Sequence, residues 1–82
     1  MKTKLKTKYG VAVKNRQGYY RIVTHKEGNH NKSLHRCVIE DYYGNIPSNH
    51  NIHHINGDKG DNRIENLVVL PIEQHKMLHN II

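Results

Sequence analysis

Residues 51–70 read NIHHINGDKGDNRIENLVVL, and this stretch decides the fold. Segments 51–55 and 67–70 are short and rich in residues that favour strands. The loop between them, at 56–62, is dense in Gly, Asp and Asn, which supply turn chemistry. Pro71 can occupy the first position of a helix, where its missing N–H is not needed. The pattern predicts a strand, a long loop, a second strand and a helix.

Four histidines are distributed over these predicted elements. His53 and His54 lie next to each other near the end of the first strand, and His75 and His79 lie four residues apart in the helix. Neighbours on a strand point to opposite sides, so one ring can bind a metal while the other contacts a water molecule. Residues four apart share a helix face and can complete the metal site. Since imidazole is both a metal ligand and a general base near neutral pH, the pattern favours metal-assisted hydrolysis.

The N-terminal part predicts further elements. Residues 9–32 hold two runs of β-forming residues around a turn, which predicts a hairpin region. Residues 33–44 predict a helix, with Ser33 as its N-cap and Gly44 at its end. Its apolar stripe is expected to contain Leu34, Cys37, Val38 and Tyr42. Residues 1–8 alternate Lys with Thr or Leu, and these lysines would share one face of an extended chain. The favoured interpretation is instead a flexible basic arm.

The chain length and composition define the class of protein. The 82 residues fit one small α+β domain, here 9–82, whose C-terminal ββα unit spans 51–80. Cys37 is the only cysteine, which excludes an intramolecular disulfide and a cysteine-type zinc site. A reducing, cytoplasmic setting is the default expectation. No apolar run approaches the ~20 residues that a membrane span requires, so no membrane partner is expected.

Charge is unevenly distributed along the chain. Residues 1–36 hold ten Lys and Arg and one acid, whereas residues 37–82 hold three Lys and Arg and six acids. The two parts carry +9 and −3, which sum to the net charge of +6. A basic first half fits a polyanion, and nucleic acid is the leading candidate. The alternative is a solvated lysine-rich surface. The hairpin cations expected to contact phosphate are Lys14, Arg16 and Arg21.

Together, these residues resemble the HNH endonuclease motif, which lies within the ββα-metal fold. The resemblance covers residues 33–80, and the spacing makes it specific. Asn66 follows His54 by twelve residues, and His75 follows Asn66 by nine. The segments that carry it are Leu34-His35-Arg36, Tyr43-Gly44, Ile46-Pro47, His53-His54-Ile55-Asn56-Gly57-Asp58, Asn62-Arg63, Glu65-Asn66-Leu67, His75 and His79.

The resemblance implies an activity and a role for each matching residue. It implies cleavage of DNA phosphodiesters with one divalent cation, and Mg, Mn, Zn and Ni all stay open as its identity. His54 is then the general base, and His53, His75 and His79 are the metal ligands. Asn66 matches the middle residue of the catalytic motif, and its amide is expected to bond backbone across the loop and hold the strand of His54.

Two further polar residues have open alternatives. Asn62 is expected to cap the short helical turn at residues 63–66 or to bond the loop. Arg36 is expected to bind phosphate or, on the alternative, to form an ion pair with Glu40 at the next helical turn.

The sequence leaves three functions to compare. The first is a nuclease that acts on double-stranded DNA. The second is a non-catalytic DNA-binding module that holds a structural zinc ion. The third is a phage packaging accessory whose nuclease acts only with partners. A homodimer or a phage protein partner is possible in each case, and a phage-encoded chain would act in the host cytoplasm.

Overall fold

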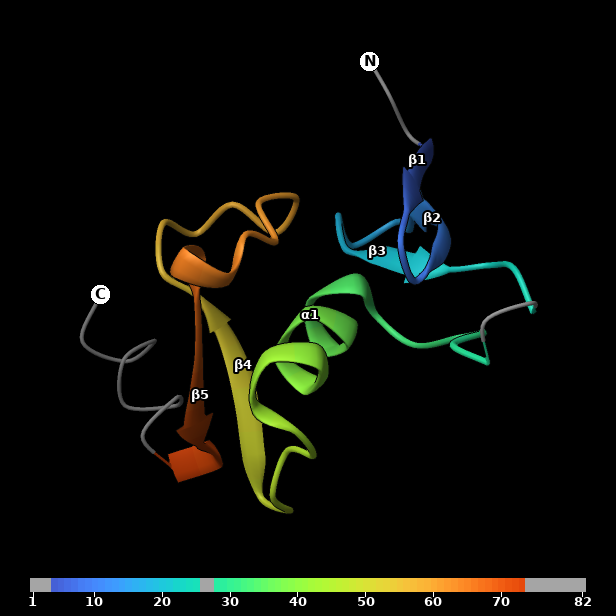
Figure 1. The fold of residues 1–82 in the computed structure, drawn as a ribbon. Coiled ribbons are helices and arrows are strands. Elements are labelled where there is room, and N and C mark those ends of the chain that lie inside the picture. The colour runs from blue at the N-terminus through green and yellow to red at the C-terminus, as the bar shows by residue number, and fades with distance from the viewer. Residues whose placement is uncertain (1–3, 26–27, 74–82) are drawn as a thin grey trace.

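Figure 1 shows a computed structural model, which describes residues 4–25 and 28–73. In that part of the chain one helix lies between two antiparallel sheets, which confirms the α+β prediction. Sheet A contains β1 (Lys4–Thr7), β2 (Gly10–Lys14) and β3 (Tyr20–Ile22), and sheet B contains β4 (His50–His54) and β5 (Leu67–Pro71). The helix is α1 (Leu34–Tyr43), and a 3-10 turn, η1 (Ile64–Asn66), precedes β5. No helix among the described residues combines the length and apolar character that a bilayer crossing requires.

Sheet A places its apolar side chains toward α1. The strands pair in the order β1-β2-β3, with Leu5 opposite Ala12 and Ala12 opposite Ile22. Because side chains alternate along a strand, these three residues share one face. Ala12 and Ile22 are fully buried, and Leu5 packs against the same core. The inner face of sheet A is therefore the apolar support for the helix.

The flexible arm predicted for residues 1–8 is wrong for residues 4–7, which form β1 and pair with β2 along their whole length. Leu5 supplies the apolar contact that holds the strand, while Lys4 and Lys6 stay exposed. The Lys–Thr/Leu alternation is thus the pattern of an edge strand with one buried face. Residues 1–3 lie outside the described part.

Helix α1 forms the centre of the core because both sheets cover it. Its buried residues are Leu34, Cys37, Val38 and Ile39. Tyr42, predicted to belong to this stripe, is 62% exposed in the last turn, so that prediction is wrong. Ile39 is buried instead, because a helix between two sheets must bury more than one stripe. The helix ends as predicted at Gly44, whose N–H donates to the Glu40 carbonyl at 2.9 Å and whose φ of 88° turns the chain out of the helix.

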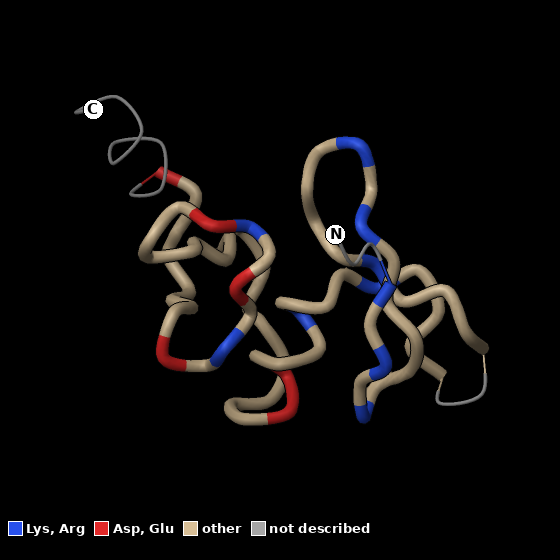
Figure 2. Tube along the Cα trace, turned by 90° about the horizontal axis from the view of Figure 1, so that it is seen from above, with Lys and Arg blue, Asp and Glu red and all other residues tan. Residues whose placement is uncertain are grey.

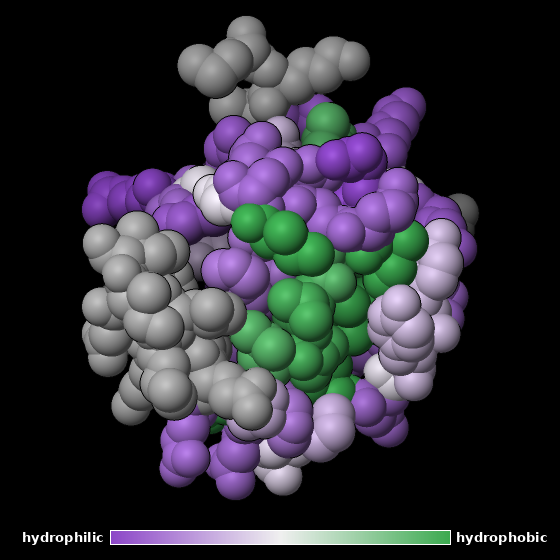
Figure 3. All heavy atoms as spheres, turned by 90° about the vertical axis from the view of Figure 1, so that its left-hand side faces the viewer, coloured by the Kyte–Doolittle hydropathy of each residue, from purple (hydrophilic) through white to green (hydrophobic). Residues whose placement is uncertain are grey.

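Sheet B has two faces with different roles. His54 lies opposite Leu67 in the register, and both are buried on the inner face toward α1. By strand alternation, His53, Val68 and Leu70 lie on the outer face. Seen from the side where β5 lies, an apolar patch is visible on the surface (Figure 3). Because His53 and His54 lie on opposite faces of β4, the two adjacent histidines point to opposite sides of sheet B.

Pro71 does not begin a helix in the manner predicted. It is the last residue of β5 and pairs with His50, which an edge strand tolerates because the missing N–H can face away from its partner. Ile72 and Glu73 follow in helical conformation. The rest of the helix predicted up to residue 80 lies outside the described residues.

Candidate active site

His54 is the last residue of β4, and its ring lies in a cluster with the rings of His35 and Tyr19. The residue is 6% exposed. The His35 ring lies edge-on to the His54 ring at a centroid distance of 5.1 Å, and the Tyr19 ring is tilted against it at 6.1 Å. Its Nε2 forms a hydrogen bond of 2.8 Å with Oδ1 of Asn62. The general base predicted from sequence is therefore a largely buried ring with defined neighbours.

His35 is the nearest ring and belongs to the first turn of α1. Burial, together with the nearby charges of His54 and Arg36, lowers the pKa of His35 to about 4. The Nε2 of His35 lies 3.2 Å from Oγ of Ser33. The predicted cap is thus in position, but the Ser33 hydroxyl pairs with His35 and makes no capping bond to the helix. His35 presents a neutral ring to His54 at neutral pH.

Asn66 ties together the two ends of the loop that follows His54. The residue is 5% exposed. Its Oδ1 accepts the Asn56 N–H at 3.0 Å, and its Nδ2 donates to Asn56 Oδ1 at 3.0 Å and to the Asp61 carbonyl at 2.8 Å. The Asn66 carbonyl also accepts the N–H of Ile55 at 2.8 Å. Two of the three side-chain bonds reach backbone groups across the loop, as expected from the sequence, whereas the catalytic role of Asn66 stays a prediction.

A charged pair completes the closure of this loop. Arg63 donates to both carboxylate oxygens of Asp61 at 2.8 Å, and Asn56 Nδ2 donates to one of them at 2.9 Å. The Arg63 guanidinium therefore holds the pKa of Asp61 well below its usual range. Asn56, Asp61, Arg63 and Asn66 thus close the loop by bonding one another.

Asn62 does not cap the helical turn as predicted. The N-cap position of η1 is Arg63, and no side chain makes a capping bond there. The Asn62 amide turns toward His54 instead, through Oδ1. Its Nδ2 is buried and, within the described part of the chain, lacks a hydrogen-bond partner. Among the described residues, the His54 ring is therefore the polar partner of this side chain.

The predicted metal ligands are only partly described. His53 lies on the outer face of β4, on the opposite side of the strand from His54. His75 and His79 lie outside the described residues. Among residues 4–25 and 28–73, no three His, Cys, Asp or Glu side chains gather in a way that could hold an ion. His53 fits a divalent transition metal by donor type, because imidazole nitrogen is a ligand that such ions accept.

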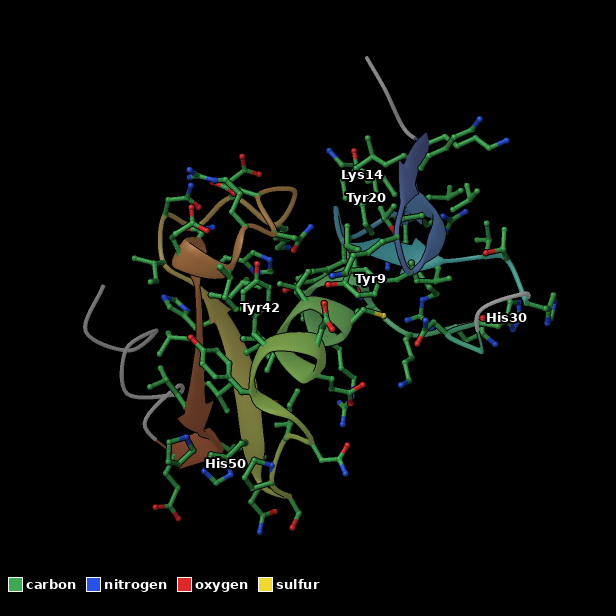
Figure 4. The ribbon with its side chains drawn as sticks, viewed as in Figure 1. Tyr9, Lys14, Tyr20, His30, Tyr42 and His50 are labelled. Atoms are coloured by element: carbon green, nitrogen blue, oxygen red, sulfur yellow. The ribbon has the colours of Figure 1, made fainter. Side chains whose placement is uncertain are left out.

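The remaining described histidines lie elsewhere. His25 and His30 stack on each other with a centroid distance of 3.7 Å, and His50 begins β4 with its Nδ1 2.9 Å from the Ser48 carbonyl. Figure 4 places His30 and His50 at opposite ends of the molecule. Neither belongs to the ring cluster around His54.

Positive charge gathers on the half of the molecule that contains sheet A (Figure 2). Four cations form ion pairs with described acids: Lys8 with Asp41, Lys32 and Arg36 with Glu40, and Arg63 with Asp61. The cations that form no ion pair with another described residue are Lys4, Lys6, Lys14, Arg16, Arg21 and Lys59. Unpaired cations thus concentrate on sheet A and its turn.

The cations predicted to contact DNA differ in their surroundings. Lys14 lies with its Nζ 5.5 Å from the centre of the Tyr20 ring, and the two side chains lie together in Figure 4. Arg16 is exposed in the β2–β3 turn, and Arg21 donates through Nη1 to the Asn31 carbonyl at 3.1 Å. Arg36 forms the ion pair with Glu40 that the sequence left as an alternative, at 3.1 Å. DNA contact by any of the four stays a prediction.

A polar cleft of about 400 Å³ lies between sheet A and β4. Its walls include Gln17, Tyr19, Arg21, Ser33, His35 and Asn51. Tyr19 and His35 line this cleft and also contact the His54 ring, so the cleft adjoins the ring cluster. The sequence did not indicate that Tyr19 belongs to the site. Its only signal was a tyrosine pair in a strand, which also fits packing in the hairpin.

Lys59 is a second residue that the sequence analysis missed. Its Nζ donates to the Gln17 carbonyl at 2.9 Å and lies 4.8 Å from the centre of the Tyr19 ring. It therefore joins the loop after His54 to the turn of sheet A. No local pattern predicts this contact, because the two residues lie 42 positions apart.

Comparison with protein families supports the resemblance found in the sequence. The family model described as HNH endonuclease matches residues 32–77, which is more than half of the chain. The chain therefore belongs to the HNH endonuclease family, a family of nucleases. No curated protein and no solved structure matches the chain.

Proposed function

We propose that this chain is a metal-dependent DNA endonuclease in which His54 is the general base. The observation that carries the proposal is the arrangement of the histidine pair on β4. His53 and His54 are neighbours that point to opposite faces of the strand. His54 ends the strand inside a ring cluster that holds it in one place. On this arrangement we assign His53 to the metal and His54 to the water molecule.

The reaction we assign is hydrolysis of a phosphodiester. The His54 imidazole takes a proton from a water molecule, and the resulting hydroxide attacks phosphorus. The bond from phosphorus to the departing sugar oxygen breaks, and that oxygen takes a proton from solvent water. His53, with His75 and His79, would hold one divalent cation, for which Mg, Mn, Zn and Ni are the candidates. Such a cation, when bound, stabilises negative charge on the phosphate and on the departing oxygen.

The surface charge supports double-stranded DNA as the substrate. The cations of sheet A form no ion pair with a described acid, so they can contact a polyanion directly. Arg21 stands in the wall of the polar cleft that adjoins the His54 cluster, so a phosphate in the cleft would lie close to the site. Contacts of this kind position the backbone and carry no sequence information. We therefore expect low sequence specificity from the isolated chain.

A plasmid assay tests the proposal. Supercoiled plasmid is incubated with the purified chain and Mg, Mn, Zn or Ni, beside His54→Ala and a matched control, His50→Ala, on the same strand. The wild type and the control are expected to cleave with at least one metal. His54→Ala should be slower by about 10²–10⁴, the usual contribution of a general base.

The possible outcomes separate the three functions. Plasmid that stays supercoiled with every metal, or equal cleavage by His54→Ala, contradicts the assignment. DNA binding without cleavage would favour the non-catalytic module with a structural zinc. Cleavage by the isolated chain at substoichiometric protein would count against a required phage partner.

A further inference from the structure

The side chain of Asn62 points away from the hydrogen bonds of its own loop. We propose that Asn62 is a positioning residue that fixes which nitrogen of His54 carries the proton, an inference that rests on the proposed role of His54. The bond between Asn62 Oδ1 and His54 Nε2 is 2.8 Å long. At the other end of the amide, Nδ2 is buried and has no partner among the described residues.

The chemistry of the two groups makes this bond directional. An amide oxygen only accepts hydrogen bonds, so the Nε2 of His54 must carry the proton that is shared with Asn62. A neutral imidazole has one N–H, and Nδ1 is then the nitrogen with a free electron pair. The bond to Asn62 thereby selects Nδ1 as the nitrogen that can take a proton from water.

The other contacts of His54 do not make this selection. Tyr19 and His35 touch the ring through their own rings, at centroid distances of 6.1 and 5.1 Å. Such contacts hold the plane of the imidazole but do not distinguish nitrogen from carbon, or one nitrogen from the other. Without a polar partner the ring can turn by half a rotation about its Cβ–Cγ bond or move its proton. Asn62 is the described residue that distinguishes the two ring nitrogens.

A merely structural role for Asn62 does not fit the loop. Asn56, Asp61 and Asn66 already tie the ends of the loop together. A residue placed for stability would pair both ends of its amide, whereas burial of the unpaired Nδ2 opposes folding. Its removal should therefore leave the fold nearly intact and act on the histidine.

The experiment compares Asn62→Ala, which removes the acceptor, with Asn62→Asp, which keeps an acceptor oxygen. The exposed Asn45→Ala is the matched control. The spectroscopic reading is the imidazole N–H signal of His54 in ¹H–¹⁵N spectra of the metal-free protein at about pH 8, where a histidine is normally neutral. Protons on exposed imidazoles exchange with water too fast to be seen, so a buried and bonded Nε2–H gives a distinct signal. Loss of that signal in His54→Ala assigns it.

We expect the signal in the wild type, Asn45→Ala and Asn62→Asp, and its loss in Asn62→Ala. The plasmid kcat of Asn62→Ala should fall at least tenfold with little change in KM, and Asn62→Asp should restore part of it. The melting temperature of Asn62→Ala should stay close to that of the wild type.

Three results would overturn the proposal. They are an unchanged His54 signal in Asn62→Ala, an unchanged kcat in Asn62→Ala, and unfolding of Asn62→Ala while Asn62→Asp folds but loses the signal. A wild type that shows the signal but cleaves nothing would overturn the proposed function and leave the Asn62–His54 bond established. The two failures are thereby distinguishable.

Discussion

Sheet A and the loop at residues 55–66 are held together by opposite means. Sheet A buries Ala12 and Ile22 completely against α1 and turns its charged residues outward. The loop, in contrast, is closed by hydrogen bonds among its own polar groups, with Asn66 at their centre. One region is stabilised by apolar burial and the other by directional bonds.

This difference explains where the candidate site lies. Apolar contacts depend weakly on direction, so they support a sheet but do not fix an individual ring nitrogen. Hydrogen bonds require defined distances and angles, and a loop built from them can hold a side chain such as Asn62 in one orientation. The chain uses its few large apolar residues for the scaffold and its Asn and Asp residues for the site. Substitutions in the two regions should accordingly have different consequences.

Asn66→Ala should have the largest effect on folding. Asn66 is only 5% exposed. Its replacement leaves the N–H of Asn56 and the carbonyl of Asp61 without their side-chain partner. We expect a loss of about 2–3 kcal/mol in the free energy of unfolding, since the change removes three side-chain hydrogen bonds, each worth about 0.5–1.5 kcal/mol. Urea unfolding measures it, with the exposed neighbour Glu65→Ala as the control.

The outcome bears directly on the comparison of the two regions. If Asn66→Ala is as stable as Glu65→Ala, the side-chain bonds do not hold the loop, and its shape must come from apolar contacts after all. Cleavage should also be lost in Asn66→Ala, because Asn62 is carried by the same loop.

The spacing of residues in the sequence predicted the second half of the molecule well. His54 and Asn66 stand at positions where periodicity and turn chemistry indicate a strand, a loop and a strand, and the structure has these elements. Local signals suffice here because the loop bonds connect residues that are near in sequence. The role of each histidine nevertheless stays a prediction, since two of the proposed metal ligands lie outside the described residues.

Predictions from the sequence were wrong or incomplete where a contact joins residues that are far apart in the chain. β1 looks like a basic arm because Leu5 is its only large apolar residue, and its partner strand can be identified only in the folded state. The direction of the Asn62 side chain is likewise invisible, because a loop has no periodicity that assigns a face. The contact between His35 and His54 joins residues from a helix and a strand, and neither element alone predicts it.

His35 contacts Tyr19, which directly precedes β3 of sheet A, and His54, which directly precedes the loop at residues 55–66. The titration of His35 should make stability depend on pH. Burial lowers the pKa of His35 to about 4 in the folded protein, whereas an unfolded histidine has a value near 6.5. Between these values the unfolded state binds more protons at this residue, so the contribution of His35 to stability falls as the pH decreases from about 6.5 to about 4 and is constant below that. The shift corresponds to about 1–3 kcal/mol, allowing for partial exposure of the ring.

Urea unfolding of the metal-free protein at pH 7 and at pH 4.5 measures this dependence. His35→Gln should lose most of it, because glutamine does not titrate, while the exposed His30→Gln should keep it. Equal pH dependence in the wild type and His35→Gln would mean that His35 is not the buried titrating group at this junction.

The smallest effect on folding is expected on the outer face of sheet A. Lys4 and Lys6 are exposed and form no ion pair with another described residue, so Lys4→Gln with Lys6→Gln should change stability by less than about 0.5 kcal/mol. Binding to duplex DNA should nevertheless weaken. If both lysines contact phosphate, the slope of log affinity against log salt should decrease by about 2.

The matched control is Lys8→Gln with Lys32→Gln, which removes the same charge from lysines that pair with Asp41 and Glu40. Both pairs are compared in the His54→Ala background, so that the DNA stays intact during titration. A paired lysine must leave its acid before it can neutralise a phosphate, and the control should therefore change the slope less. If the two double variants lower the slope equally, net charge alone governs binding. The unpaired cations of sheet A would then contribute no more to DNA binding than the paired ones.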